Sequence, residues 1–287
     1  MYPDMKKILI PIDFSDNSLN ALHYGQSLFE DFEVTFYLFS AYVVLPSNLL
    51  GDDWGNEWVE AMSFGVEDDL ENVVSQIKKL NNNSKHQFKS ISKLDRFIPS
   101  IKSIVVDYNI DFIVMGTKGV KGLKSVFLGS NAVKVINAIS KCPTIVVPQD
   151  FMPKKIKQVV FSTNYKRPFA EAELKPLFKL LKHHDATLNI VQIMEDTILT
   201  EKQKTHKQAL SYLLDDIPHF FHKIIYETSE TKAIKDFIMK TQSDMVSFIH
   251  HKNNFFYNLT NEDVVEKTSF NSLVPLLILP AHTNNKI

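Results

Sequence analysis

Apolar and polar positions along the chain predict strands and helices in regular alternation. Residues 6–13 form a nearly continuous apolar run that ends in Asp13, as expected of a strand buried on both faces. A turn at 14–18 then leads to helical spacing over 19–32. The same succession continues to residue 148. It predicts further strands at 33–44, 86–94, 111–115 and 143–148, helices at 64–81, 95–108 and 130–140, and an irregular connection at 44–62 that holds Trp54 and Trp58.

The pattern then starts again. The apolar run at 157–164 restates 6–13 after 151 positions, and 275–280 restates 143–148 after only 132. The difference of 19 residues is about the length of the tryptophan-bearing connection, which the second half lacks. We therefore predict an internal duplication joined at 149–155. The elements expected in the second half are strands at 157–164, 186–194, 222–228, 244–249 and 275–280, and helices at 202–221 and 231–241.

Strands that alternate with helices, through connections too long for hairpins, indicate a parallel sheet with helices on both faces. The predicted fold is α/β, with two tandem doubly wound domains at 1–150 and 151–287, each containing a five-stranded parallel sheet. Ligands bind such sheets at the carboxyl ends of strands, where the strand order reverses. Asp13, Ala41 and Gly116 all fall at such ends, and we expect them to converge on one crevice.

The stretch after 111–115 has the composition of a phosphate-binding loop. The chain has eight glycines, of which four lie between 116 and 129 and none lies later. Glycine lets the backbone approach an anion closely, and the first N–H groups of a following helix point at it unpaired. Ser130 can add a hydroxyl donor, and Asn131 a cap or a further donor. Positive charge is close by, on Lys118, Lys121 and Lys124.

Composition narrows the class of protein. With 32 basic and 33 acidic residues in 287, nothing favours a nucleic-acid or anionic-membrane partner. No apolar run has the length of a membrane span, and the N-terminus lacks the organisation of a signal peptide. The lone Cys142 precludes an internal disulfide and suits a reducing compartment. The sequence reads as that of a cytoplasmic globular protein.

At this point the chain resembles the universal stress protein family in a tandem two-domain form. The matching stretches are Ile-Leu-Ile-Pro-Ile-Asp-Phe-Ser at 8–15, Gly116-x2-Gly119-x9-Gly129-Ser130, and Cys-Pro-Thr-Ile-Val-Val-Pro at 142–148. The first half matches along its length, the second only in strand order and at its two ends. The resemblance implies an adenine nucleotide alpha hydrolase-like fold and a bound ATP or related adenine nucleotide, with Mg²⁺ accompanying it.

By that resemblance, Asp13 would receive polar atoms of the adenine or ribose, and the backbone at Ala41 would meet the adenine. The glycines, Ser130 and Asn131 would hold the ribose and phosphates. The full set of expected binding residues is Pro11, Ile12, Asp13, Ala41, Met115, Gly116, Lys118, Gly119, Gly129, Ser130 and Asn131.

The second half departs from this pattern at each chemical position. Asn164 stands where Asp13 stands, and His-His-Lys-Asn-Asn at 250–254 replaces the loop that begins at Gly116. Without glycine this loop cannot easily cradle phosphate. We expect a degenerate domain, kept as scaffold, partner surface or regulator, and therefore one nucleotide per chain.

Other motifs have simpler interpretations. The pairs His183-His184 and His250-His251 fit helix-end or surface histidines better than metal ligands, which must converge. Ser15 fits a turn or helix cap better than a nucleophile, because no histidine is expected in the same crevice. Two function classes remain: a nucleotide-binding regulatory protein of the stress response, with at most slow ATP hydrolysis, or a scaffold whose sites are vestigial. A third class, an enzyme such as a transferase built on the same sheet, has no catalytic pair in this sequence to support it.

The two apolar runs bounded by proline, 143–148 and 275–280, predict how the halves meet. Proline is disfavoured inside a central strand, so each run suits the edge of its own sheet. An uncovered apolar edge invites aggregation. We expect the two strands to pair across a pseudo-two-fold axis, as the domains of similar proteins do. The tandem chain would then stand in for a dimer of single domains, and a further homodimer is left open.

Overall fold

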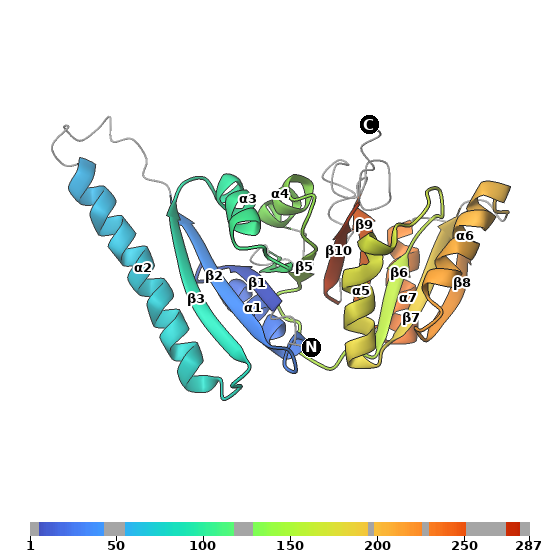
Figure 1. Ribbon diagram of the computed structural model, residues 1–287, viewed down its shortest axis with the longest axis horizontal. Coiled ribbons are helices and arrows are strands. Elements are labelled where there is room, and N and C mark those ends of the chain that lie inside the picture. The colour runs from blue at the N-terminus through green and yellow to red at the C-terminus, as the bar shows by residue number, and fades with distance from the viewer. Residues whose placement is uncertain are drawn as a thin grey trace.

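The computed structural model describes residues 6–42, 55–117, 129–194, 198–225, 230–250 and 274–281, with the backbone alone for 55–64, 193–194 and 230–231. Strands and helices alternate through both halves (Figure 1). The first half contains β1 (Lys6–Pro11), α1 (Asp16–Leu28), β2 (Val34–Tyr42), α2 (Gly55–Leu80), β3 (His86–Leu94), α3 (Phe97–Asp107), β4 (Phe112–Gly116), α4 (Ser130–Ala138) and β5 (Thr144–Val147). The second contains β6 (Gln158–Ser162), α5 (Glu171–His184), β7 (Thr187–Met194), α6 (Glu201–Leu213), β8 (His219–Ile225), α7 (Glu230–Thr241), β9 (Met245–His250) and β10 (Leu276–Pro280).

The ten strands of the described residues form one sheet in the order β3-β2-β1-β4-β5-β10-β9-β6-β7-β8. Pairing is parallel within each half, as predicted. At the centre β5 and β10 run antiparallel, with Val146 opposite Leu276 and Ile145 opposite Leu277. Figure 1 shows this seam between the two halves. The second half therefore repeats the strand order of the first about a pseudo-two-fold axis, and the predicted pairing of 143–148 with 275–280 is confirmed.

Helices cover both faces of the sheet, and each hydrophobic core runs through both halves. On one face α1, α2, α5 and α6 bury residues such as Leu22, Leu70 and Leu177 against the strands. On the other face α3, α4 and α7 bury residues such as Ile101 and Val135. Because both cores continue across the β5–β10 seam, the halves share their hydrophobic packing as well as their sheet.

A hydrogen bond from the backbone of β1 to an aspartate before β4 recurs between the equivalent strands of the second half, β6 and β9. Asp111, just before β4, accepts the backbone N–H of Lys7 at 2.9 Å. Asp244, just before β9, accepts the N–H of Lys157 at 2.7 Å and that of Gln158 at 2.9 Å. A carboxylate that accepts backbone N–H groups fixes the start of one strand against the next. The duplication therefore extends to individual side chains.

Three expected elements differ from those observed. α2 begins at Gly55 rather than 64, so Trp58 lies in a helix and not in an irregular connection; Trp54 lies outside the described residues. The expected helix 202–221 ends at Leu213, and β8 begins at His219 rather than 222. Pro218 explains why the helix does not continue to 221, because proline lacks an N–H and drives the preceding residue out of the helical region. The expected elements also left out α5, a complete helix before β7.

Candidate functional site

Three neighbouring strands end where the sequence places a ligand. β2, β1 and β4 are adjacent in the sheet, and their carboxyl ends share one edge. The chain stays in register beyond them, since Ile12 N–H donates to Phe39 O at 2.7 Å and Thr117 N–H donates to Val147 O at 3.0 Å. This edge gathers six of the residues expected to bind nucleotide: Pro11, Ile12, Asp13, Ala41, Met115 and Gly116.

Asp13 is exposed at this edge and held by the turn that starts α1. Ser15 donates its backbone N–H, at 3.2 Å, and its hydroxyl to Asp13 Oδ1. The Ser15 oxygen accepts the N–H of Ser18 at 3.3 Å, so Ser15 is the N-cap of α1, as predicted. Burial acts to raise the pKa of Asp13, but hydrogen bonds from Ser15 and Ser18 outweigh it and lower the pKa below its ordinary value. Asp13 is therefore a carboxylate at neutral pH, an acceptor rather than an effective general base.

Gly116 is required by a close approach between β4 and α1. A Cβ added to Gly116 would lie 2.6 Å from the backbone oxygen of Asn17 and 2.5 Å from its Nδ2. Real Cβ atoms essentially never come that near. Gly116 thus lets the first turn of α1 lie directly on the end of β4. The sequence predicted a ligand contact for Gly116, whereas in the structure Gly116 lies against Asn17.

Two buried polar atoms at this edge have no hydrogen-bond partner in the described residues. They are Oδ1 of Asn17 and Oγ1 of Thr117, a residue only 2% exposed. A buried polar atom without a partner costs about 1–3 kcal/mol, so such atoms are normally satisfied. Their position beside Asp13 and Gly116 makes them candidates to contact a ligand. Neither residue was predicted, because an asparagine in a first helical turn and a threonine after a strand are unremarkable in sequence.

α4 presents an N-terminus that no side chain of the described residues caps. Its N-cap is Gly129, which has no side chain to cap the first turn, and that turn contains no acidic residue. Ser130 and Asn131 are exposed in this turn. Gly129, and not Asn131, is therefore the cap. An uncapped helix N-terminus carries unpaired N–H groups and partial positive charge, which favour an anion. Lys118 and Gly119 lie outside the described residues.

The corresponding edge of the second half is tied to its own chain. Asn164 Oδ1 accepts the N–H of Lys166 at 3.0 Å, so this side chain stabilises its own turn. From α6, Gln203 Nε2 donates to the carbonyl oxygen of Asn164 at 2.9 Å, and His206 Nδ1 lies 2.8 Å from the oxygen of Tyr165. The turns of the two halves share one backbone feature, since Phe14 and Tyr165 both have positive φ, 59° and 54°. The backbone conformation of the turn after β1 is thus repeated after β6, while the polar groups of the second turn bond to their own chain.

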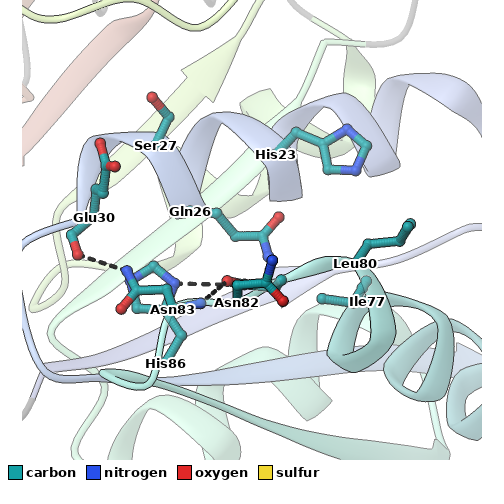
Figure 2. A pocket seen from close by; sticks show the side chains of 10 residues that line it. His23, Gln26, Ser27, Glu30, Ile77, Leu80, Asn82, Asn83 and His86 are labelled. Carbon is teal, nitrogen blue, oxygen red and sulfur yellow. Dashed lines mark hydrogen bonds between the residues drawn. The ribbon is translucent and has the colours of Figure 1, made fainter.

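A cavity lies at the opposite end of the strands of the first half. It measures about 490 Å³ and lies between α1 and the end of α2. Figure 2 shows Gln26 of α1 reaching toward Asn82, with Leu80 on the other wall. Its floor is rigid, because His86 Nε2 lies 3.1 Å from Phe29 O and Asn83 donates to Glu30 O at 2.7 Å. Its lining includes Glu30 and no lysine or arginine, so it does not suit a phosphate.

The paired histidines of α5 lie where the two halves meet. His184 Nε2 is 3.0 Å from the carbonyl oxygen of Leu28 at the end of α1. The His183 ring lies against the Phe32 ring, with 3.8 Å between the centroids and 37° between the ring planes. Desolvation lowers the pKa of both histidines. They join α5 to α1 mainly as neutral rings, rather than as the charged partners of a helix dipole that the sequence suggested.

No three His, Cys, Asp or Glu side chains of the described residues are grouped so that they could hold a metal ion. His250 ends β9, and His251 lies outside the described residues. Cys142 is a free thiol, and burial raises its pKa, which makes it a poor nucleophile. Among the described helices, none combines the length and the hydropathy of a membrane span.

Comparison with known proteins identifies the first half directly. The model of the universal stress protein family matches residues 5–148. A universal stress protein of Methanocaldococcus jannaschii is 32% identical over 152 residues, which is 52% of this chain and 84% of that protein. A universal stress protein structure from Archaeoglobus fulgidus aligns with 95% of both chains at a TM-score of 0.68 and 19% identity. A protein assigned to the family in Pseudomonas aeruginosa aligns with 96% of this chain and 93% of its own at 0.63 and 11%. These two structures share the fold of the whole chain.

Proposed function

Since the chain belongs to the universal stress protein family, we propose that it is a cytoplasmic regulatory protein of the stress response that binds one adenine nucleotide. The nucleotide would lie at the carboxyl edge of β2, β1 and β4. The observation that supports this most is the set of polar groups left without partners at that edge. They are the buried oxygens of Asn17 and Thr117 and the uncapped first turn of α4.

The residues at this edge fit the parts of such a ligand. The carboxylate of Asp13 would accept hydrogen bonds from ribose hydroxyls or the adenine amine, and the backbone at Ala41 would meet the adenine ring. Gly129, Ser130 and Asn131 would bind phosphate oxygens through the N-terminus of α4. Lys118 and Gly119 belong to the proposal on sequence grounds. Mg²⁺, which proteins often hold through one or two carboxylates and the phosphates, would accompany the phosphates of the nucleotide.

We further propose that residues 1–150 and 151–287 are separate domains and that the second has lost its site. Asn164 offers no carboxylate, and its side-chain oxygen already accepts Lys166 N–H. α6 binds the carbonyl oxygens of Asn164 and Tyr165, so the turn after β6 is occupied by its own chain. The second domain would serve as scaffold or regulator. The lowered pKa of Asp13 makes it a weak base, so hydrolysis would be slow at most.

Calorimetric titration with ATP tests this proposal. We expect one site per chain, and a stoichiometry of two would contradict the loss of the second site. Asp13→Ala should weaken binding by about 1–3 kcal/mol, the range for a charge-assisted hydrogen bond. The matched variant Asn164→Ala should leave affinity unchanged. If the purified protein carries no nucleotide and binds none at millimolar concentration, the alternative of a scaffold with vestigial sites would replace this proposal.

A further inference from the structure

The outer end of the first half contains a groove that the nucleotide proposal does not use. β3 is the last strand of the sheet at this end, and α2 packs beside it (Figure 1). Between them lies an open groove of about 700 Å³, here called the β3 groove. It is lined by Glu71, Val74, Ser75, Lys78 and Lys79 of α2 and by Phe88, Lys89 and Ser90 of β3.

The register of β3 shows which backbone groups face this open side. Val34 N–H of β2 donates to the carbonyl oxygen of Lys85 at 2.9 Å, with His86 paired to Val34. In a parallel ladder alternate residues turn both backbone groups to the same neighbour. The odd-numbered residues of β3 therefore face β2, and the even-numbered residues, including Phe88, Ser90 and Ser92, direct N–H and C=O outward. Within the described residues β3 pairs with β2 alone, so this row forms a template for another strand.

The groove also has an apolar floor and a basic wall. Phe88 and Val74 are 6% and 8% exposed and form the floor. Two lysines of α2, Lys78 and Lys79, line the groove against one carboxylate, that of Glu71, while the ammonium of Lys89 lies 5.8 Å from the centroid of the Tyr37 ring. Lys78 and Lys79 are exposed on α2. An edge strand beside a helix is the arrangement by which proteins add an extended peptide, with backbone bonds giving affinity and side-chain pockets giving specificity.

We propose that the β3 groove binds an extended acidic segment of a partner protein, which adds to β3 as an eleventh strand. The partner's backbone pairs with the outward groups of Phe88, Ser90 and Ser92. Its carboxylates face the ammonium groups of Lys78 and Lys79, and a small apolar side chain contacts Phe88. The balanced charge of the whole chain does not favour a nucleic acid at this position.

The other end of the sheet lacks this arrangement. There Leu188 N–H donates to Pro218 O at 2.8 Å, so β8 has the same register toward β7 as β3 has toward β2. Its outward residues include His219 and Phe221. The ammonium of Lys207 from α6 lies over the Phe221 ring, 4.9 Å from its centroid, where the first half has an open groove. The proposal therefore assigns the partner to one end of the molecule, and β8 serves as an internal control.

Exposed lysines at an edge also have a simpler role, since charge discourages edge-to-edge aggregation. Fluorescence anisotropy with a labelled ten-residue peptide of alternating Val and Glu separates the two roles. We expect saturable binding by the full-length protein. Ser90→Pro removes one outward N–H at an edge position where proline is tolerated, and should weaken binding at least tenfold. Ser90→Ala keeps that N–H and should bind within twofold of wild type.

The basic wall has its own matched pair of variants. Lys78→Glu with Lys79→Glu should weaken binding at least tenfold, while Lys102→Glu with Lys202→Glu, the same charge change on α3 and α6, should have little effect. The proposal would be overturned if both pairs of variants lost peptide affinity equally. It would also be overturned if heparin competed with the labelled peptide as well as the unlabelled peptide does, or if no binding were seen at millimolar peptide. Amide hydrogen exchange on the wild type gives an answer even if Ser90→Pro fails to fold. The peptide should slow exchange at Ser90 and Ser92 and not at Phe221, and the absence of that protection would equally refute an added strand.

Discussion

Replacing glycine by alanine at three positions should change stability with signs that the structure dictates. At Gly116 the new methyl would lie 2.6 Å from the backbone oxygen of Asn17, and ordinary contact begins at 3.4 Å. A gap of 0.8 Å, the difference between these two distances, must therefore open between β4 and the first turn of α1. The oxygen is part of the helix backbone and cannot rotate away. Overpacking of this kind costs about 1–3 kcal/mol, and we expect Gly116→Ala to lower the free energy of unfolding by that amount.

The other two glycines provide controls within the same chain. An alanine methyl at Gly65 in α2 meets nothing within 4 Å, so the gain in helix propensity, about 1 kcal/mol, should appear in full. At Gly25 in α1 the methyl would lie 3.3 Å from the Cδ1 atom of Ile10. That atom ends a side chain which can shift slightly. The gain in helix propensity and the cost of crowding against Ile10 should therefore nearly cancel, and the free energy of unfolding should stay close to that of wild type.

Urea denaturation followed by circular dichroism measures all three changes against wild type. The expected order of stability is Gly65→Ala above wild type, Gly25→Ala near it and Gly116→Ala below it. The variant Asn17→Ala adds a further test, because it removes the Nδ2 contact but leaves the backbone oxygen. In a double-mutant cycle it should recover only part of the loss at Gly116. A Gly116→Ala protein as stable as wild type would refute the assignment of Gly116 to a close approach.

Three further predictions concern the frame around the site. Asp244→Ala should cost about 2 kcal/mol because it leaves two part-buried N–H donors without their acceptor, whereas Asp111→Ala, with one such donor, should cost about 1; urea midpoints compare them. The pKa of His184 is lower in the folded protein than in the unfolded chain, so on acidification the unfolded chain binds a proton at this histidine first. Stability should therefore fall below about pH 6.5, and His184→Gln should flatten the dependence of melting temperature on pH. Val146→Asp buries a carboxylate opposite Leu276 and should cost at least about 3 kcal/mol, measured by the same melts; a loss under 1 kcal/mol would argue against the seam.

The order and direction of the strands could be predicted because buried parallel strands are continuous apolar runs. The repeat of such runs after residue 150 also gave the pairing of the two halves. The ends of helices and strands were harder to predict where a single residue determines them. The predicted helix 202–221 runs through Pro218, where the apolar spacing is helical but proline cannot continue a helix. Gly51 and Gly55 suggested a loop, although Gly55 is the first residue of α2 and the Glu, Ala and Met residues that follow it favour a helix.

The site was predictable in its position but not in all its members. Asp13, Ala41 and Gly116 could be placed together because carboxyl ends of adjacent parallel strands share one edge. Asn17 and Thr117 could not, since their significance lies in buried oxygens without partners, a property of packing rather than of residue type. The same holds for Gln203 and His206, which close the turn after β6 from a helix about 40 residues further along the chain. In the sequence, the missing glycines and Asn164 in place of Asp13 pointed to that difference between the halves.

The geometry explains why one half can lose a binding site without the chain losing its fold. Strand β5 needs β10 as a neighbour, and both hydrophobic cores continue from the first half into the second. The apolar strand residues of the second half are therefore required whether or not a ligand binds there. In the turn after β6 the Tyr165 side chain stays buried in this core, while the backbone carbonyl oxygens of the turn are held from α6 by two hydrogen bonds. Removing Gln203 and His206 together should accordingly loosen this turn while leaving the seam intact, because the contacts that join the halves lie at the opposite side of the second half, along β10 and α5.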